Sequence, residues 1–361
     1  MSENQISIQD IIAGIKPVEA AWRDEAKERT SQLVMPPRAL GRLHDFSEKI
    51  CAVQKTLRPD VSRKAVLVFA GDHGIMEEGF SPFPQEVTPE MIKTFLRDGA
   101  GINALATHVG AEVEVIDTGI IPDLDPGMLQ GGHRLTICKT GRGTANFSRG
   151  PAMTRQEAEQ CIVSGFQRTA ELIDQGIQLL GTGDMGIGNT SPSAAIGAVL
   201  TRTPLKDMVG RGTGVDDPAL KRKLEAIERG IAINRPDPAD GLDVLARVGG
   251  FEIGGIAGCL LAGAYHGVPM VLDGFISTAG GLIAHSLCPR VLEYCFAGHC
   301  SQEQGHRPML DFLGLEPILD LGMRLGEGTG AALAMSVLEA GVKMFNQVLT
   351  FAEAGVSGAS S

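Results

Sequence analysis

The chain has 361 residues, of which 43% are hydrophobic and 21% charged, a composition typical of a globular protein with about two domains. Its formal net charge of −11 argues against a nucleic-acid partner, because phosphate backbones are bound by a surplus of lysine and arginine. Small anionic substrates are not excluded, since local donors hold them.

The cysteines and the N-terminus indicate a cytoplasmic protein. Seven cysteines, without a CxxC pair or regular spacing, argue against a disulfide framework or a zinc ribbon. Residues 1–9 lack the basic start and apolar core of a signal peptide. The most apolar run, Ile253–Tyr265, is interrupted by glycine and too short to span a bilayer. We therefore expect no membrane and no nucleic acid as a partner.

In chain order, residues 1–56 are predicted to be helical, with a break at Pro36 and Pro37. Residues 64–70 form a continuous apolar run, typical of a buried strand, which ends in a Gly-Asp-His-Gly loop at residues 71–74. Thr88 and Pro89 favour the start of a helix that continues to about His108. Further strands are expected at residues 112–117, 177–180 and 268–273, and further helices at 154–174 and after Asp217.

Strands that alternate with helices predict an α/β fold with a doubly wound, mainly parallel, Rossmann-like sheet. We assign residues 61–287 to a large nucleotide-binding domain of this type. Residues 1–60 and 288–361 are expected to join as a smaller helical domain, with 356–361 as a disordered tail. Ligands of such sheets bind beyond the carboxyl ends of the strands, so the loops there are the candidates for chemistry.

The first candidate loop is Gly181–Thr190, which follows an expected strand and formally contains GxGxxG. Glycines let backbone N–H groups approach a phosphate, and a following helix N-terminus favours an anion. A plain strand-to-helix turn explains a lone motif equally well. A dinucleotide fold would need an acidic residue about 20 positions later at a strand end, and the polar stretch around Thr203 and Pro204 does not resemble one.

The second candidate is Gly210–Asp217, which precedes another helix, with Lys223 inside that helix. Backbone N–H groups and Lys223 could hold a phosphate, but from spacing alone a surface lysine beside Lys221 and Arg222 is the better interpretation.

The third candidate is Glu327, flanked by Gly326 and Gly328. Glycine neighbours offer a carboxylate no side-chain cover but let a ligand approach closely. A carboxylate beside a helix N-terminus is the alternative, and the two remain equally open. The loop at residues 71–74 is interpreted as structural or substrate-shaping, because adjacent aspartate and histidine rarely ligate one ion by themselves. We expect no metal and no cofactor.

Together these loops resemble the nicotinate-nucleotide–dimethylbenzimidazole phosphoribosyltransferase family. The resemblance extends from about Val34 to Phe351, and its ordered set of motifs is specific although each motif alone is weak. The matching segments are Pro36–Leu43, Gly71–Gly74, Phe83–Thr88, Gly181–Pro192, Gly210–Lys223, Asp240–Leu245, Leu272–Phe275 and Met323–Gly330.

The resemblance implies that Glu327 is a general base, which takes a proton from one ring nitrogen of a flat base while the other nitrogen attacks the ribose C1′ of nicotinate mononucleotide. Burial is expected to raise its pKa, against the pull of a helix N-terminus. Asp184 would support it, although the family usually has glutamate there and the shorter side chain puts that role in doubt. The family also implies a homodimer.

The resemblance further assigns binding residues for both substrates. Around the nucleotide it places Gly183, Gly186, Ile187, Gly212, Thr213, Gly214, Lys223 and Ser301. For the slot that receives 5,6-dimethylbenzimidazole or another flat base, such as a purine or a phenol, it implies Phe83, Met91, Met185 and Leu325. Two other functions remain as alternatives: a nicotinamide-dinucleotide oxidoreductase, and a nucleotide-binding protein without activity.

Overall fold

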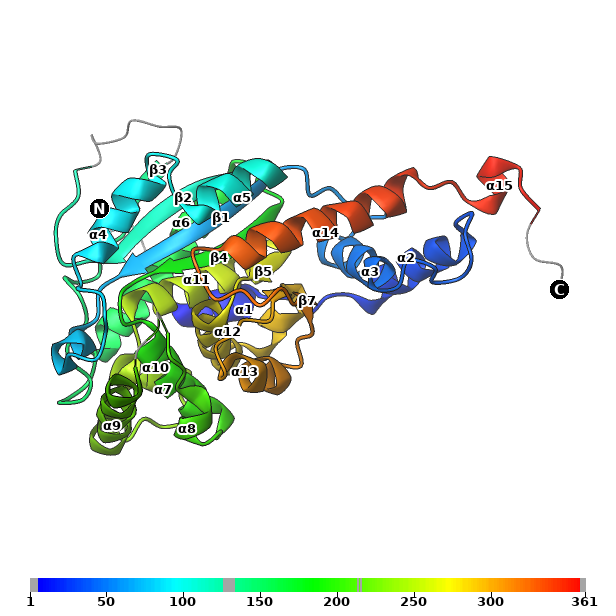
Figure 1. Cartoon of the computed structure of the whole chain (residues 1–361). Helices are drawn as coiled ribbons and strands as arrows, with labels where there is room; N and C mark the ends of the chain where they lie inside the picture. The colour runs from blue at the N-terminus through cyan, green and yellow to red at the C-terminus, as the bar shows by residue number, and fades with distance from the viewer. Residues whose placement is uncertain (1–5, 126–133, 213, 215, 358–361) are drawn as a thin grey trace.

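The computed structural model describes residues 6–125, 134–212, 214 and 216–357. In this part of the chain a seven-stranded sheet has the order β3-β2-β1-β4-β5-β6-β7, with all neighbouring strands parallel (Figure 1). Because the order reverses between β1 and β4, the predicted doubly wound α/β sheet is confirmed. The strands are β1 (Lys64–Gly71), β2 (Ala111–Gly119), β3 (Arg134–Ile137), β4 (Leu179–Met185), β5 (Met270–Leu272), β6 (Cys295–His299) and β7 (Pro317–Leu319).

Strand β1 shows why helices cover both faces of the sheet. Leu67 and Phe69 enter one apolar core, while Val66 and Val68 enter the other, as the alternation of a strand requires. The first core includes α1 (Ile8–Gly14), α6 (Arg155–Asp174), α10 (Gly241–Val248), α11 (Phe251–His266) and α12 (Phe275–Leu287). The second includes α3 (Arg42–Gln54), α4 (Val87–Phe95), α5 (Gly101–Val109) and α14 (Thr329–Gln347).

The remaining helices extend the body at the end where the site lies and along an arm (Figure 1). Beside the site are α7 (Thr190–Thr201), α8 (Leu205–Met208), α9 (Asp217–Asn234) and α13 (His306–Leu313), with the short 3-10 turn η1 (Gly74–Glu78). A second 3-10 turn, η3 (Pro289–Tyr294), leads into the amino end of β6 and contacts α11 and α12. The arm contains α2 (Ala20–Gln32), α3, the end of α14 and α15 (Phe351–Ala354). None of the helices in the described ranges is long and apolar enough to cross a membrane.

Segments near the two ends of the chain meet in the arm, although α1 itself packs against α6 and α11 in the body. Leu33 and Thr350 form an antiparallel bridge, and Ala26, Cys51 and Phe345 share a small apolar cluster. However, the stretch from residue 288, which was expected to belong to a helical domain, contributes β6 and β7 to the central sheet. The proposed boundary at 287 is therefore wrong for the sheet, because strands of five and three residues are too short to stand out among helices. A separate helical domain stays a prediction, and residues 358–361 of the expected tail lie outside the described residues.

Two element boundaries also differ from the prediction. The helix expected from residue 88 to 108 is two helices, α4 and α5, because Asp98 between them has a left-handed backbone with φ of 60°. Strand β4 continues through Gly181 and Gly183, which were assigned to a loop. A β-carbon at Gly183 would lie 2.5 Å from the carbonyl oxygen of Glu327, so this glycine allows α14 to begin against the strand. The segment with the GxGxxG pattern is therefore mostly strand and not a phosphate-binding loop. The interpretation as a dinucleotide-binding protein rested on this loop and is no longer supported.

Candidate active site

A cavity of about 260 Å³ opens beyond the carboxyl ends of β4, β5 and β6, where a doubly wound sheet places its ligands. Ten of the predicted site residues line it together. They are Phe83, Met91, Asp184, Met185, Gly186, Ile187, Gly212, Ser301, Leu325 and Glu327. Segments far apart in the sequence thus meet because parallel strands deliver their carboxyl ends to one edge of the sheet.

The predicted nucleotide residues that do not line this cavity have different places. Gly183 lies within β4 and packs against the backbone of Glu327. Gly214 lines a neighbouring surface pocket and Lys223 a small adjoining cavity. Thr213 lies outside the described residues. The space beyond the α-carbon of Gly183 is filled by the turn before α14, so its place at the nucleotide stays a prediction.

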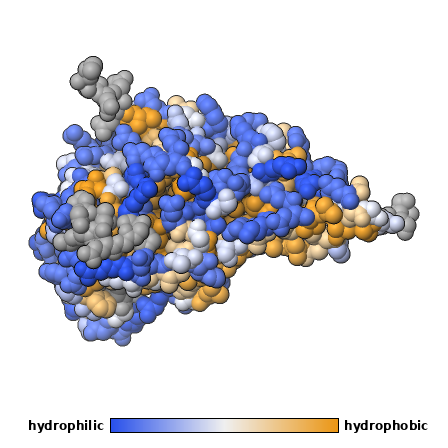
Figure 2. Space-filling view, turned by 90° about the horizontal axis from the view of Figure 1, so that it is seen from above, coloured by the Kyte–Doolittle hydropathy of each residue, from blue (hydrophilic) through white to orange (hydrophobic). Residues whose placement is uncertain are grey.

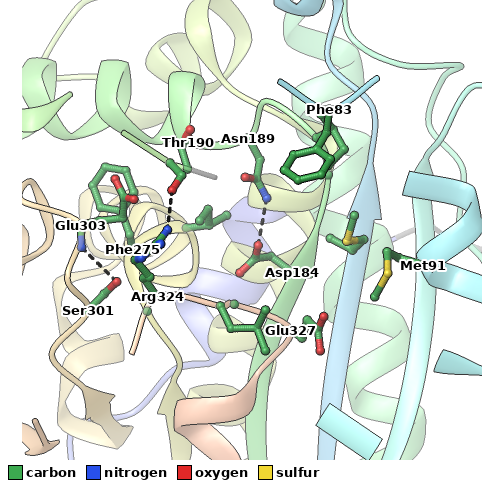
Figure 3. Close-up of a pocket in the computed structure, with 18 of the residues that line it drawn as sticks. Phe83, Met91, Asp184, Asn189, Thr190, Phe275, Ser301, Glu303, Arg324 and Glu327 are labelled. Carbon is green, nitrogen blue, oxygen red and sulfur yellow. Dashed lines mark hydrogen bonds between the residues drawn. The ribbon is translucent and has the colours of Figure 1, made fainter. Parts of the chain in front are cut away.

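Figure 3 shows that the cavity has two unlike ends. Ser301, Glu303 and Arg324 gather at one side, whereas Phe83 and Met91 lie at the other, with Asp184 and Glu327 between them. Phe83 is 45% exposed and Leu325 is 60% exposed, so the apolar end is open to solvent. An apolar ring entering there would cover these side chains, and a polar group would suit the opposite end.

Glu327 is held in an uncommon backbone conformation at the wall of the cavity. Its φ is 62°, and its neighbours Gly326 and Gly328 also have positive φ angles. A left-handed non-glycine residue costs on the order of 1–3 kcal/mol and persists only where surrounding contacts impose it. Here the N–H of Glu327 donates to the carbonyl oxygen of Asp184 over 3.2 Å. The strain lies at the residue that carries the candidate chemistry.

The carboxylate of Glu327 is only 6% exposed, and burial raises its pKa. The N–H of Ile102, in the first turn of α5, donates to Oε2 over 3.2 Å and opposes this rise, while the negative charge of Asp273 adds to it. Burial therefore outweighs the main-chain donor at the start of α5, and the pKa is raised, as expected. The result is a carboxylate that accepts a proton more readily than an exposed glutamate.

Asp184 is a second buried carboxyl group in the wall. Burial raises its pKa well above the usual range, and the charges of Asp273, Glu252 and Glu327 act in the same direction. A hydrogen bond of 2.9 Å from the side-chain amide of Asn189 to Oδ2 opposes them. Asp184 is therefore favoured in its protonated form, in which it donates a hydrogen bond rather than accepting a proton.

Lys223 is 2% exposed, so the interpretation as a surface lysine is wrong. Its Nζ donates to Thr190 Oγ1 over 2.8 Å and to the carbonyl oxygen of Gly210 over 3.1 Å. Burial lowers its pKa to about 8, although Glu303 opposes this. The lysine and the first residues of α7 line the adjoining cavity, which shares Gly186 and Gly212 with the larger one. A cation beside a helix N-terminus is a site for an anion.

The Gly-Asp-His-Gly loop at residues 71–74 packs against the turn after β4, which forms part of the cavity wall. His73 Nε2 lies 3.0 Å from Glu252 Oε1, and both side chains are buried. Burial disfavours the charged imidazole, but Glu252 prevails and raises the pKa of His73. A β-carbon at Gly186 would lie 2.3 Å from the carbonyl oxygen of Gly71 and 3.1 Å from His73 Nε2. The His73–Glu252 pair therefore packs behind the turn that follows β4 and does not line the cavity.

Comparison of the sequence and structure with known proteins shows which family the chain belongs to. Residues 15–356 match the family described as phosphoribosyltransferase, DBI_PRT. A nicotinate-nucleotide–dimethylbenzimidazole phosphoribosyltransferase of Geotalea uraniireducens is 51% identical over 97% of this chain and 98% of its own length. The chain belongs to this phosphoribosyltransferase family. It is therefore an enzyme, a glycosyltransferase of the pentosyltransferase class.

Other relatives agree with this assignment. The protein of the same name from Geobacter sulfurreducens is also 51% identical, over 97% of this chain and 98% of its own. The crystal structure of CobT from Thermus thermophilus is similar with a TM-score of 0.88 and 45% identity, covering 94% of this chain and all of that chain. The resemblance drawn from the loop motifs is thus confirmed across nearly the whole length.

Several residues of this phosphoribosyltransferase site were not assigned from the sequence. Asn189 and Thr190 lay in a quoted motif, but their side-chain directions depend on the turn into α7. Arg324 precedes Glu327 and donates to the carbonyl oxygen of Gly212 over 3.1 Å. Glu303 is 8% exposed, and His299 is 1% exposed at the end of β6. His299 and Glu303 reach the cavity because the short strand β6 leads to it, and the sequence pattern did not indicate this strand.

Proposed function

We propose that this protein transfers the phosphoribosyl group of nicotinate mononucleotide to 5,6-dimethylbenzimidazole or a similar flat base, with Glu327 as the general base. The products are an α-ribazole 5′-phosphate and nicotinate. The names of the relatives support the reaction. The observation that carries the assignment of the base is the position of the Glu327 carboxylate, sheltered in the wall between an apolar and a polar end of one cavity.

The chemistry needs one base. A ring nitrogen of the acceptor forms a bond to C1′ as the bond from C1′ to the nicotinate nitrogen breaks on the opposite face. The electron pair of the broken bond neutralises the pyridinium, so nicotinate leaves without an acid. Glu327 takes the proton from the second nitrogen of the acceptor. Such proton transfer contributes about 10²–10⁴-fold, and alignment of the two substrates contributes much of the rest.

The two ends of the cavity suit the two substrates. We place the acceptor against Phe83, Met91, Met185 and Leu325, which present apolar surfaces to a flat ring. A slot of this kind separates similar rings mainly by shape, so purines and phenols remain possible alternatives to benzimidazoles. This part of the proposal concerns the class of the acceptor.

We place the phosphate between Lys223 and the start of α7, where a cation and helix N–H groups combine. Gly186, Ile187 and Gly212 then approach it with their backbone, and Ser301 faces the ribose. Glu303 Oε2 is buried without a hydrogen-bond partner among the described residues, and we assign it to a ribose hydroxyl group. Without such a donor its burial would be unfavourable.

Asp184 in this proposal does not act as a second base. Its raised pKa leaves it protonated, and it holds a substrate atom by donating a hydrogen bond. This assignment fits the family position usually occupied by glutamate, since the role needs a proton but not the longer reach of a base.

The protein is further proposed to be a cytoplasmic homodimer. All seven cysteines are free, which suits a reducing compartment. Figure 2 shows hydrophobic residues along one side of the arm. Leu349, just before α15, and Val356, just after it, are exposed. Apolar surface of this kind is typical of an interface. Light scattering tests the dimer.

A product assay tests the reaction itself. The protein is incubated with nicotinate mononucleotide and a panel of flat bases, and nicotinate release and the nucleotide products are separated chromatographically. Proton NMR of the product then reports the configuration at C1′. We expect an α-riboside from 5,6-dimethylbenzimidazole. A β-riboside, or binding of nicotinate mononucleotide without release of nicotinate, would contradict the displacement mechanism.

A further inference from the structure

Asp273 directly follows the carboxyl end of β5, an interior strand of the sheet, and is 1% exposed. Its carboxylate accepts three main-chain hydrogen bonds from the start of α14. Oδ2 accepts from the N–H of Gly328 over 3.2 Å, and Oδ1 accepts from those of Gly330 and Ala331 over 2.7 and 3.0 Å. All three donors follow Glu327 within four residues. The side chain therefore holds the segment that presents the general base.

The opposite side of this segment is held by β4. The N–H of Glu327 donates to the carbonyl oxygen of Asp184, and the glycine at 183 leaves room for the Glu327 backbone. Between these two supports lie residues 326, 327 and 328, all with positive φ. Without Asp273, only β4 would support the turn, through the N–H of Glu327. Among the described residues, no other side chain accepts from the N–H groups of Gly328, Gly330 and Ala331, which follow the strained residue.

The charges around Asp273 come from several elements. His299 on β6 lies with Nε2 3.8 Å from Asp273 Oδ1, Asp184 belongs to β4, and Glu327 precedes α14. On α11, Glu252 pairs with His73 and acts on Asp184. Among these groups, Asp273 is the one whose negative charge raises the pKa of Glu327, in addition to the effect of burial. Its carboxylate thus acts on Glu327 both through the backbone and through its charge.

We infer that Asp273 is a positioning residue for the phosphoribosyl transfer, which holds the turn at residues 326–331 so that the Glu327 carboxylate faces the acceptor ring. The inference rests on the proposed function of Glu327. Asp273 does not line the cavity and touches no substrate in this assignment; it acts mainly by holding the turn that carries Glu327, and its charge also adds to the raised pKa of Asp184. It therefore affects turnover more than substrate binding, and its charge adds to the burial that raises the pKa of Glu327.

Asp273→Asn tests this role, because it keeps the shape and one acceptor oxygen but removes the charge. A displaced general base costs up to about 100-fold in turnover. We expect kcat to fall about 10- to 100-fold while KM for nicotinate mononucleotide changes less than about twofold. The acidic limb of the kcat profile should move to lower pH, since the neighbouring negative charge is gone.

Asp117→Asn is the matched control. Asp117 lies near the carboxyl end of β2, is also fully buried, and accepts main-chain hydrogen bonds from Gly119 and Ile120 over 3.0 and 2.9 Å. It does not line the cavity or contact the turn before α14. We expect this variant to keep the wild-type kcat profile. If Asp273→Asn gave the same kcat and pH profile as Asp117→Asn, the inference would be overturned.

A double-variant comparison separates this inference from the proposed function. In a Glu327→Gln background, Asp273→Asn should reduce kcat much less than in the wild type, because its main effect passes through the missing base. An additional loss of the same size as in the wild type would overturn the inference. If Glu327→Gln alone kept full turnover, the proposed function would fail first. If Asp273→Asn does not fold, Asp273→Ser replaces it, and failure of both to fold would mark Asp273 as structural and overturn the inference.

Discussion

The main-chain N–H of Ile102 donates to Oε2 of Glu327 over 3.2 Å, across 225 residues of sequence. This contact joins the first turn of α5 to the turn before α14. It holds one carboxylate oxygen in place without neutralising the group, because a single main-chain donor lowers the pKa less than burial raises it. In the proposed mechanism, this contact orients the Glu327 carboxylate and leaves its pKa raised.

Glu327→Gln should keep nucleotide binding but reduce kcat by about 10²–10⁴-fold, because the amide cannot accept the proton. Glutamine has nearly the same shape and still accepts the Ile102 hydrogen bond. Glu316→Gln, at an exposed glutamate with a side chain 73% exposed, serves as the control and should behave as wild type. Isothermal calorimetry with nicotinate mononucleotide measures binding. Turnover close to wild type would reject the role of Glu327.

The pH dependence of kcat should reflect the raised pKa of Glu327. The residue works as a base only when deprotonated, so activity falls as the pH drops through its pKa in the complex. Burial places that midpoint above the ordinary glutamate value of 4.5. Initial rates from pH 4 to pH 9 with saturating substrates provide the measurement. An acidic limb at or below 4.5 would show that burial does not dominate.

Gly101→Ala should reduce kcat by about tenfold, through a small displacement of the base. A β-carbon there would lie 2.9 Å from Leu325 Cδ2 and 3.3 Å from Glu327 Oε2, so the flexible leucine moves and the carboxylate is pushed. Gly150→Ala is the control, since a β-carbon at Gly150 meets nothing within 4 Å. Steady-state kinetics of both variants decides, and equal kcat values would contradict the prediction.

Lys223→Met should raise KM for nicotinate mononucleotide by about 10- to 100-fold, the range for losing a hydrogen bond to a charged group. The methionine keeps the apolar stem but not the cation. KM for the nucleoside without its phosphate should be unchanged, which separates phosphate binding from a general defect. Lys221→Met, on the same helix with a side chain 78% exposed, is the control. An equal loss with both substrates would remove Lys223 from the phosphate site.

Asp184→Asn should stabilise the protein at pH 8 and not at pH 4. The pKa of Asp184 is raised by burial, so the folded state resists its ionisation, whereas the unfolded chain ionises it freely. Stability therefore falls as pH rises above the ordinary aspartate value, and asparagine removes that loss. We expect Tm to rise by about 1–3 °C at pH 8. Asp24→Asn, at a side chain 72% exposed, should show no such pH-dependent difference.

The sequence alone determined the sheet and most of the residues at its edge. The apolar run of β1 and the helical periods between strands predict a parallel doubly wound sheet, because these patterns depend on local spacing. Glycine-rich segments around Asp184, Gly212 and Glu327 were recognised from their composition and order along the chain. The family resemblance that they carry assigned the ten residues that line one cavity.

Only the tertiary structure decided which side chains face that cavity and in which protonation state. Gly183 packs against the Glu327 backbone, and Lys223 is buried. His299 ends β6, a strand too short to recognise, and Glu303 follows it. Asp273 reaches the start of α14 across more than 50 residues. Burial and long-range hydrogen bonds depend on how distant segments pack, and a local pattern carries no record of that packing.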